Sequence, residues 1–418
     1  MISARDLEFR VDFTYRLRFT GDVLRRETST LLELMPAEGA ARVLFVVDAQ
    51  VADAVAWLVP ELEGLGRRFP DRVELSGPVH RVAGGEGCKN SSEAVDALLD
   101  RINADNLDRR NYVVVIGGGA VLDAVGLAAA VAHRGVRLIR LPTTTLGQDD
   151  SGIGVKNAIN RYDKKNWQGT FAVPWAVVND QQLLETLPDR DFRAGFSEAV
   201  KVSLLKEPAF FDYLCRHARD LADRRPDVAR QAIERSAVWH LQHITRGGDP
   251  FEMLEARPLD FGHWSAHKLE PMTAYRLRHG EAVAVGLAID CVYSSMVHGL
   301  PADEAERVCA CLEALGLTLS HPLLADVDTL LGGLEEFRQH LGGQLTVTML
   351  RGVGDPIDVH RIDREAMAEA ILRVARRPRI DAPPARATTE HEAGPAVSAV
   401  VNHRPRRSAI ASGQGVEA

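Results

Sequence analysis

The sequence has 418 residues, more than one domain commonly needs and enough for two domains that each have a full hydrophobic core. Hydrophobic residues make up 45% and charged residues 26% of the chain, the ordinary balance of a soluble globular protein. The net charge of -8 argues against a general nucleic-acid partner.

The cysteines and the lack of long apolar runs predict a cytoplasmic protein. Five cysteines are scattered along the chain without a CxxC pair, which is typical of reduced thiols. The first residues, MISARDLEFRVDF, are charged and contain no apolar run of signal-peptide length. No run of about 18 uncharged apolar residues occurs, so we expect no membrane span.

Four apolar, β-branched runs predict buried strands in the first part of the chain. They cover residues 41–49, 111–119, 136–142 and 175–180. Runs that are apolar almost throughout are typical of a parallel sheet covered on both faces. Helical patterns lie between them, for example at 51–65 and 91–107. Residues 1–181 are therefore predicted to form an α/β domain, doubly wound around a mainly parallel sheet.

From about Leu183 the apolar residues follow the spacing of helices instead. We expect helices over residues 192–205, 226–244, 263–270, 280–297 and 303–316, and a strand near 344–352. Residues 182–376 are thus predicted to form a mostly α-helical second domain. The remainder, 377–418, is rich in Pro, Ala, Ser and charge without periodicity, and we expect a disordered tail.

Three glycines, Gly117–Gly119, connect a predicted strand to a predicted helix. Such a turn lets backbone N–H groups approach a pyrophosphate at the N-terminus of the helix. The run is not a GxGxxG motif, and a tight turn without a ligand is the alternative. Asp48 ends an earlier strand, where an acid can bond a ribose hydroxyl or merely cap a helix. Together the two features favour dinucleotide binding.

Small polar residues and lysines gather among glycines in the segment 141–166. The segment contains Thr143, Thr144, Asp149, Asp150, Lys156, Lys165 and Asn166. Lysines in a glycine-rich loop are suited to a ligand that carries phosphate. A solvated connecting loop is the alternative interpretation.

Histidines and a glutamate in the second half form a candidate metal site. His263 and His267 are four residues apart and share one face of a predicted helix. Glu198, His263 and His279 would supply three oxygen and nitrogen ligands and leave one position open, which fits catalytic rather than structural Zn²⁺. Spacing alone leaves surface histidines, and a solvated pair of Glu198 with Lys201, as alternatives.

Eight motifs follow one another in a specific order. They are GGE..CK (Gly84–Lys89), GGGAVLD (Gly117–Asp123), HRGVRLIRLPTTTL (His133–Leu146), DSGIGVK (Asp150–Lys156), KKN (Lys164–Asn166), AGFSEAVK (Ala194–Lys201), DFGHWSAH (Asp260–His267) and RHGEAVAVG (Arg278–Gly286). In this order, from about Asp48 to Gly354, the sequence resembles the sugar phosphate cyclases, whose best-known member is 3-dehydroquinate synthase.

The resemblance implies bound NAD⁺, a divalent metal (usually Zn²⁺, with Co²⁺ as an alternative) in the helical domain, a small sugar phosphate substrate and a homodimer. The family's metal ligands match Glu198, His263 and His279. Its NAD-contacting positions match Asp48, Glu86, Lys89, Gly118, Gly119, Asp123, Thr143, Thr144 and Lys165. Its substrate positions match Arg134, Asp150, Lys156, Asn166, Lys201, Arg257 and His267, although the spacing of Arg257 to the FGH motif differs by one residue.

The implied reaction recycles NAD⁺. A substrate hydroxyl is oxidised, phosphate is eliminated, the hydride returns, and ring opening with an aldol step closes a carbocycle. The metal would polarise the alkoxide and carbonyl oxygens. His267 would transfer protons, Lys156, Lys201 and Arg134 would hold anionic charge, and Asp150 completes the implied catalytic set.

Several departures from the shikimate-route synthase concern the substrate. Asp260 replaces an Asn, a substrate-binding lysine aligns with Gln242 or His243, and His340 takes the place of another lysine. Less positive and more negative charge disfavours a carboxylate substrate and favours a neutral polyol end. The sequence is accordingly most similar to the 2-epi-5-epi-valiolone synthases, which act on sedoheptulose 7-phosphate, and to related cyclases of Ebo-type clusters. Several valiolone-type enzymes lack a histidine matching His267, so the product epimer stays open.

The leading prediction is a carbon-oxygen lyase that cyclises a heptulose phosphate. The first alternative is 3-dehydroquinate synthase, which Asp260 and the missing lysine oppose. The second is a metal-dependent NAD(H) alcohol or glycerol dehydrogenase, which Lys156 and Lys165 oppose. The third is a non-catalytic NAD-binding protein, which the complete Glu-His-His set opposes.

Overall fold

The computed structural model describes residues 6–162, 164–247, 249–251, 258–340 and 343–380. Contacts group the chain into two units, Met1–Ala382 and Pro383–Ala418. All the helices and strands below belong to the first unit, and the second lies outside the described residues.

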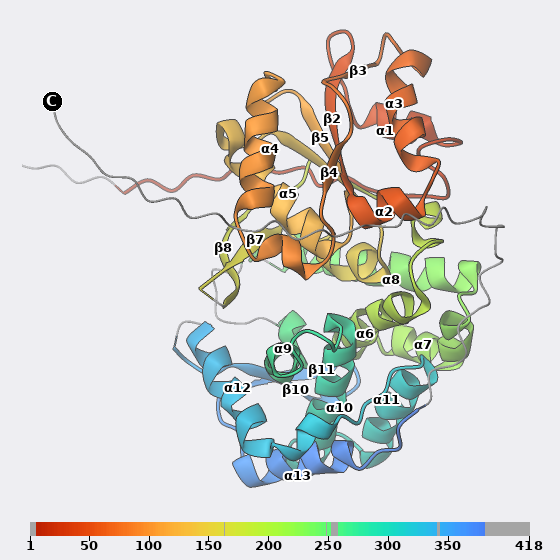
Figure 1. Ribbon diagram of the computed structural model, residues 1–418. Helices are drawn as coiled ribbons and strands as arrows, with labels where there is room; N and C mark the ends of the chain where they lie inside the picture. The colour runs from red at the N-terminus through yellow and green to blue at the C-terminus, as the bar shows by residue number, and fades with distance from the viewer. Residues whose placement is uncertain (1–5, 163, 248, 252–257, 341–342, 381–418) are drawn as a thin grey trace, which may run out of the picture. The chain divides into compact units, whose positions relative to one another are not determined.

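A seven-stranded parallel sheet forms the centre of the first half of the chain (Figure 1). Its strand order is β1-β9-β6-β5-β2-β3, and β4 also pairs with β2. The strands are β1 (Leu17–Thr20), β2 (Ala41–Asp48), β3 (Val73–Leu75), β4 (His80–Val82), β5 (Tyr112–Gly117), β6 (Arg137–Pro142) and β9 (Ala176–Asp180). The predicted parallel sheet is therefore confirmed, and the carboxyl ends of β5 and β6 lie side by side because Gly117 pairs with Pro142.

Alternate residues of the central strands pack on opposite faces of this sheet. In β2, Phe45 joins a core with α1 and α3, whereas Leu44 joins a core with α4 and α5. Since both faces are covered, the strand is apolar at every position from Val43 to Val47, and the run reads as continuous in the sequence. The helices of this half are α1 (Thr28–Glu33), α2 (Ala49–Ala54), α3 (Leu58–Arg68), α4 (Glu93–Ala104) and α5 (Gly119–Val131).

The helix expected over residues 51–65 is two helices. α2 ends at Ala54 and α3 begins at Leu58. Pro60 lies in the first turn of α3, where its missing N–H breaks no helical hydrogen bond. Within one continuous helix the same proline would remove a backbone hydrogen bond. The break between α2 and α3 therefore has a physical cause.

The polar segment 141–166 is more ordered than a loop. After β6 it forms a π-helical turn (Gly147–Ser151) and then β7 (Lys156–Arg161), which pairs antiparallel with β8 (Lys164–Phe171). The hairpin has no alternating apolar pattern, because Asn157 and Asn160 occupy buried positions of β7. Strand rules based on apolar residues therefore missed it.

The second half is mostly helical, as predicted. It consists of α6 (Asp189–Lys206), α7 (Pro208–Ala222), α8 (Pro226–Arg246), α9 (His263–Met272), α10 (His279–Val297), α11 (Ala302–Ala314), α12 (Val327–His340), α13 (Arg364–Ala375) and the hairpin of β10 (Val347–Gly352) with β11 (Asp355–Val359). Three of these helices, α7, α12 and α13, were not expected. Short helical turns η1 (Glu86–Lys89), η2 (Ala132–Arg134), η4 (Gln181–Leu184), η5 (Pro258–Asp260) and η6 (Pro322–Ala325) connect the larger elements.

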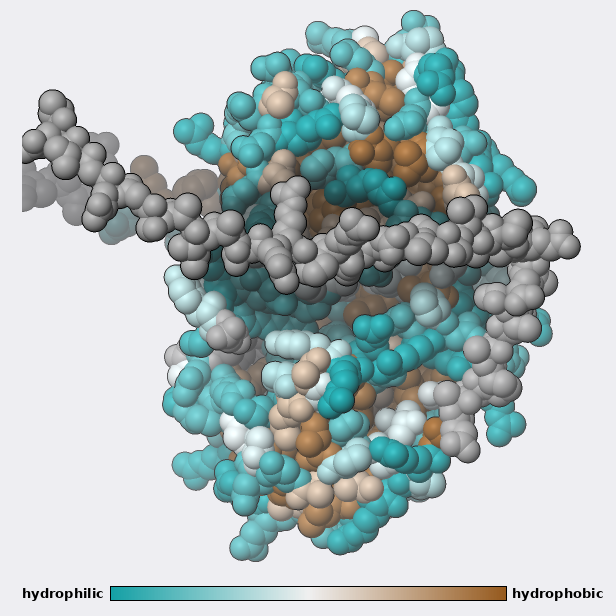
Figure 2. Space-filling view, in the orientation of Figure 1, coloured by the Kyte–Doolittle hydropathy of each residue, from teal (hydrophilic) through white to brown (hydrophobic). Residues whose placement is uncertain are grey.

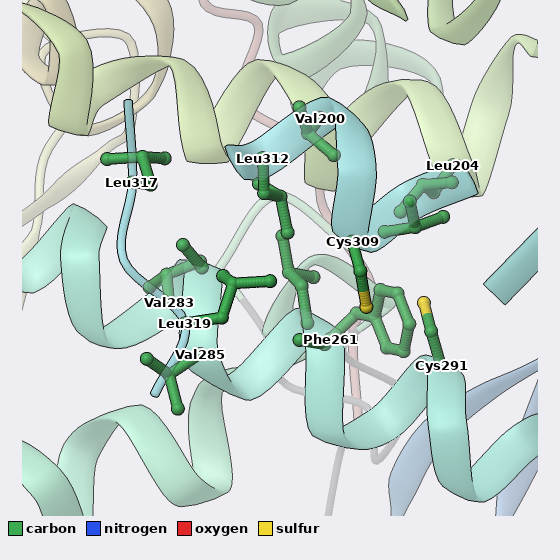
Figure 3. Packing of buried hydrophobic residues seen from close by; sticks show 14 of the residues in the cluster. Val200, Leu204, Phe261, Val283, Val285, Cys291, Cys309, Leu312, Leu317 and Leu319 are labelled. Atoms are coloured by element: carbon green, nitrogen blue, oxygen red, sulfur yellow. The ribbon is translucent and has the colours of Figure 1, made fainter. Parts of the chain in front are cut away.

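One apolar core holds the helical half together. Figure 3 shows Phe261, just before α9, beside the sulfur atoms of Cys291 and Cys309. α10 is long and apolar enough to span a membrane, but 72% of its 18-residue apolar window is buried, as in the core helix of a soluble protein. In the view of Figure 2 hydrophilic residues cover most of the described surface.

The chain stays packed slightly beyond α13. Arg377 forms ion pairs with Glu306 and Glu313 of α11, and the hydroxyl of Thr318 donates to the carbonyl of Ile380 at 3.2 Å. The predicted tail begins at residue 377, and residues 381–418 lie outside the described part of the chain.

Candidate active site

The three predicted metal ligands converge from three helices. Glu198 lies in α6, His263 begins α9 and His279 begins α10. Their ligand atoms all lie within 4.8 Å of one another, and the Nε2 atoms of His263 and His279 are 3.5 Å and 3.6 Å from Oε1 of Glu198. This oxygen is fully buried and has no hydrogen-bond partner among the described residues. An orphaned carboxylate oxygen that faces two imidazole nitrogens fits a divalent ion.

Charge in the centre of the site is balanced by Lys201, one helical turn from Glu198. Its ammonium forms an ion pair with Oε2 of Glu198 and lies 3.5 Å from Oδ1 of Asp150. Burial alone would raise the pKa of Glu198, but Lys201 and His263 outweigh burial and hold that pKa well below its usual value. Glu198 is therefore an anion at neutral pH, the form in which a carboxylate binds a metal ion.

Glu270, which the sequence analysis left without a role, supports His279 from behind. Its Oε1 lies 3.3 Å from Nδ1 of His279 and accepts a hydrogen bond from Nζ of Lys165 at 2.7 Å. Burial opposes the charged form of His279, but Glu270 and Glu198 together raise its pKa to about 9. A carboxylate on the far nitrogen of a ligating histidine fixes the ring and its tautomer. In the sequence, the one sign of this role is that Glu270 lies one helical turn after His267.

A left-handed turn presents His263. Gly262 has φ of 77°, and a Cβ there would lie 2.9 Å from the backbone nitrogen of Leu287. Oδ2 of Asp290 accepts the N–H of Gly262 at 3.0 Å, and Oδ1 accepts the indole N–H of Trp264 at 2.8 Å. Nδ1 of His263 is 3.0 Å from the carbonyl of Phe261, which leaves Nε2 to face Glu198. The turn is thus tied to α10 on both sides of the histidine.

A second residue that the sequence did not reveal is His240 of α8. Its Nδ1 lies 2.9 Å from Oδ1 of Asp150, the oxygen that also faces Lys201. Burial would raise the pKa of Asp150, but Lys201 and His240 lower it to about 2. Asp150 is therefore ionised and held between two basic side chains. No motif marks His240, because it lies 90 residues from its partner in the chain.

Asp149 differs from its neighbour in every respect. It is fully buried, and neither carboxyl oxygen has a hydrogen-bond partner among the described residues. Burial, with the nearby charges of Asp150 and Glu198, holds its pKa well above the usual value. Ionisation is therefore disfavoured at Asp149, whereas the neighbouring Asp150 is held ionised.

A buried arginine shapes the chain between Asp150 and Lys156. Arg140 of β6 is fully buried. Its guanidinium donates to the carbonyls of Gly152, Gly154 and Lys156 at 3.1 Å, 2.7 Å and 3.3 Å, and to the side chain of Asn157 at 2.6 Å. The carbonyl of Ile153, between Gly152 and Gly154, accepts a hydrogen bond from the hydroxyl of Tyr15 at 2.6 Å. This segment owes its shape to side chains distant in the sequence.

The predicted dinucleotide residues surround the carboxyl ends of β2, β5 and β6. Asp48 caps α2 by accepting the N–H of Gln50 at 2.9 Å, so the alternative of a helix cap is realised. A Cβ on Gly84 would lie 2.2 Å from Oδ1 of Asp48, so any larger residue there would displace this carboxylate. Gly118 precedes the first residue of α5, Gly119, whose turn exposes the backbone N–H groups suited to an anion.

Lys89 ties this end of the sheet to the β7–β8 hairpin. Its ammonium donates to Asp123 at 2.6 Å and contacts Oδ1 of Asn166. The side chain of Asn160 donates to Glu86 at 3.0 Å. Thr143 and Thr144, two further predicted NAD contacts, follow β6 directly.

The other predicted substrate residues are less closely assembled. The pKa of Lys201 is raised by Asp150 and Glu198 and, to a smaller extent, by the charge of Asp260. Lys156 is exposed at the start of β7, and Arg134 lies in η2 with φ of 63°. The ring of His267 is 5.4 Å from that of His263, and the side chain is exposed. Arg257 and the side chain of His340 lie outside the described part of the chain.

Known proteins match the chain along most of its length. The family model described as 3-dehydroquinate synthase N-terminal matches residues 79–194, and its C-terminal counterpart matches 195–336. A 3-dehydroquinate synthase of Caulobacter vibrioides is 35% identical over 68% of this chain and 78% of its own. A 2-epi-valiolone synthase of Actinosynnema mirum is 34% identical over 88% of this chain and 94% of its own.

A solved structure has the same fold. It is the 2-epi-5-epi-valiolone synthase of Streptomyces hygroscopicus subsp. jinggangensis, with NAD⁺ and Zn²⁺ bound. It has a TM-score of 0.78 and 27% identity, and the match covers 89% of this chain and 99% of that one. The chain therefore belongs to the 3-dehydroquinate synthase family, whose members are lyase-type sugar phosphate cyclases.

Proposed function

We propose that this protein is an NAD- and divalent-metal-dependent cyclase that converts sedoheptulose 7-phosphate into a valiolone-type cyclitol with loss of phosphate. Asp260 carries the substrate assignment. It adds negative charge beside Lys201, where a substrate carboxylate would be repelled and hydroxyl groups would be accepted. The 34% identity to a 2-epi-valiolone synthase along 88% of the chain supports the same choice.

In this proposal Glu198, His263 and His279 hold the metal, Zn²⁺ or alternatively Co²⁺. Support comes from their convergence around a buried carboxylate oxygen without a partner. The NAD contacts are Asp48, Glu86, Lys89, Gly118, Gly119, Asp123, Thr143, Thr144 and Lys165. When bound, the metal supplies Lewis-acid polarisation and NAD⁺ supplies reversible hydride transfer.

The chain's own residues bind the substrate and manage its charge and protons. Lys201 and Asp150 form an ionised pair beside the metal ligands, suited to orienting substrate hydroxyls. His267 lies one turn from His263. Desolvation, together with His263 and Lys165, holds the pKa of His267 well below its usual value, so its imidazole is neutral at pH 7 and in the form that accepts a proton from the substrate.

The phosphate and the far end of the substrate require further groups. We assign the phosphate to Lys156, Arg134 and Asn166, which offer donors and positive charge. Arg257 and His340 remain proposed substrate contacts. The boundary between the NAD-binding domain and the metal- and substrate-binding domain is proposed near residue 181, between β9 and α6. Cytoplasmic location agrees with the five free cysteines.

The decisive experiment is phosphate release with identification of the organic product by mass spectrometry and NMR. Purified protein with NAD⁺ and Zn²⁺ is given sedoheptulose 7-phosphate and, separately, the deoxy-heptulosonate phosphate of the shikimate route. We expect phosphate and a cyclitol from the first substrate only, without net NADH. Phosphate from neither substrate, or accumulation of NADH, would contradict the proposal.

The second candidate is 3-dehydroquinate synthase. It is favoured by the relative of that name from Caulobacter vibrioides, which is 35% identical to this chain. Dehydroquinate formed from the acid substrate would establish it. That result would also show that Asp260 does not exclude a substrate carboxylate.

A further inference from the structure

Four of the five cysteines lie in two pairs around one helix, an arrangement for which the proposed activity has no use. Cys309 and Cys311 both belong to α11 and, being two residues apart, point to different sides of that helix. Cys309 lies near Cys291 of α10, as Figure 3 shows, whereas Cys311 lies next to Cys215 of α7. All four pack in the core of the helical half, and all four are free thiols.

An ion pair fixes the register of α7 against α11 beside the second of these pairs. The guanidinium of Arg307 in α11 contacts the carboxylate of Asp212 in α7, and its Cζ lies 4.9 Å from the centroid of the Phe211 ring. Cys215 comes three residues after Asp212, and Cys311 comes four residues after Arg307. One helical turn beyond the ion pair, the two cysteines therefore face each other, and their side chains share a hydrogen bond.

The same neighbours make the two thiols of this pair unequal. The hydrogen bond with Cys311 and the charge of Arg307 lower the pKa of Cys215, although burial and the charge of Asp212 oppose them. The hydrogen bond with Cys215 and burial hold the pKa of Cys311 well above its usual value. Cys215 is half-buried, whereas Cys311 is buried. Thiolate character and access to solvent therefore coincide at Cys215, as reactive cysteines require.

The pair between α10 and α11 lacks both properties. Cys291 and Cys309 are fully buried. Burial raises the pKa of Cys309 to about 12 and holds that of Cys291 well above its usual value. Thiols in such surroundings are inert. This pair is therefore an internal reference, because it has the same chemical groups in the same core without the access and the thiolate character.

We propose that Cys215 and Cys311 form a site of reversible oxidation by peroxide. The sulfur of Cys215 attacks one oxygen of hydrogen peroxide, the O–O bond breaks, and a sulfenic acid and one water form. The sulfur of Cys311 then attacks the sulfur of the sulfenic acid, the S–O bond breaks, and a disulfide and a second water form. The peroxide takes up the two electrons that the thiols lose, and the protons of both thiols leave in the waters.

The second step keeps the oxidation reversible. A sulfenic acid without a neighbouring thiol is open to further oxidation to a sulfinic acid, which a thiol cannot reduce. A disulfide is instead returned to two thiols by exchange with a dithiol. The hydrogen-bonded sulfurs are already in contact, and a bond of about 2.05 Å requires rotation of the two side chains rather than a new arrangement of α7 and α11.

The test maps the cysteines of the full chain by mass spectrometry after treatment with hydrogen peroxide. Free thiols are alkylated before digestion to prevent exchange. We expect a peptide in which a disulfide joins Cys215 to Cys311, lighter than its reduced form by two hydrogen atoms and restored by dithiothreitol, while Cys291 and Cys309 stay thiols. Three results would overturn the proposal: a sulfinic acid at Cys215 without the disulfide, a Cys291–Cys309 disulfide formed at the same peroxide concentration, or a Cys215 thiol that outlasts that of an unstructured cysteine peptide.

Variants separate the two steps, after circular dichroism has shown that each keeps the fold. In Cys311→Ser the sulfenic acid of Cys215 should accumulate and be trapped by dimedone, and a failure to trap it would contradict the first step. Cys309→Ser, two residues away in α11, is the matched control and should form the disulfide like the parent. Arg307→Gln should slow the loss of the Cys215 thiol about two- to fivefold, the effect of losing one partly exposed favourable charge. Arg373→Gln, at an exposed arginine of α13, should leave that rate unchanged, and equal rates in the two arginine variants would remove Arg307 from the site.

Discussion

Replacing Glu270 with Gln should change how metal affinity depends on pH. In the parent the pKa of His279 is about 9, so a proton competes with the metal at neutral pH. Because this group's pKa is raised, affinity is greatest above pH 9 and is lost as pH falls. Relative to its value well above pH 9, where His279 is deprotonated, the affinity at pH 7 is lower by about 100-fold, or about 2.7 kcal/mol. Gln keeps the shape of the side chain but removes the charge that sustains this protonation.

Two effects of Glu270→Gln therefore oppose each other. Losing the carboxylate 3.3 Å from Nδ1 of His279 weakens the orientation of the ligand, which typically costs about 10–100-fold in metal affinity. The same change lowers the pKa of His279 and removes most of the proton competition below pH 9. We expect the variant to bind Zn²⁺ more weakly at pH 9.5, and the two affinities to converge near pH 7.

The assay is competition for Zn²⁺ against a chelator of known affinity, from pH 6.5 to pH 10. Glu336→Gln is the matched control. Glu336 is an exposed carboxylate of α12 that pairs with Lys268, and Lys268 lies in α9 like Glu270. That variant should follow the parent at every pH. Parallel profiles for Glu270→Gln and the parent, whatever their offset, would refute the role assigned to Glu270.

Three further changes test other parts of the site. Asp290→Asn leaves either the N–H of Gly262 or the indole of Trp264 without its acceptor, so unfolding by urea should show a loss of about 1–3 kcal/mol; unchanged stability would mean that Asp290 does not hold the turn. Arg140→Met removes four hydrogen bonds from the segment that leads into β7 and from the first two residues of that strand. It should lower kcat/KM at least about tenfold while Zn²⁺ affinity stays that of the parent. A parallel loss of metal would point to general unfolding instead. Asp260→Asn should shift the ratio of kcat/KM toward the carboxylate substrate by about tenfold, whereas an unchanged ratio would remove Asp260 from substrate selection.

Much of the fold could be predicted because its signals are local. Strands buried on both faces are rich in apolar residues, so β2, β5, β6 and β9 are visible in the sequence, although β6 also buries Arg140. The 3.6-residue period likewise marks the amphipathic helices. The β7–β8 hairpin gave no such signal, since buried asparagines replace apolar residues there. The break between α2 and α3 was missed although Pro60 marks it.

The sequence alone determined the types of residue in the candidate site and the family resemblance. Glu198, His263 and His279 were singled out by their chemistry, and the family comparison agrees with the resemblance. Only the tertiary structure brought in Glu270, His240 and the buried Arg140, because their roles depend on which atoms they face and not on neighbours in the chain. Glu270 contacts Lys165, which is 105 residues away in the sequence, and His240 contacts Asp150, which is 90 residues away. Such contacts are set by how helices and sheet pack, and packing of this kind leaves no periodic trace in the sequence.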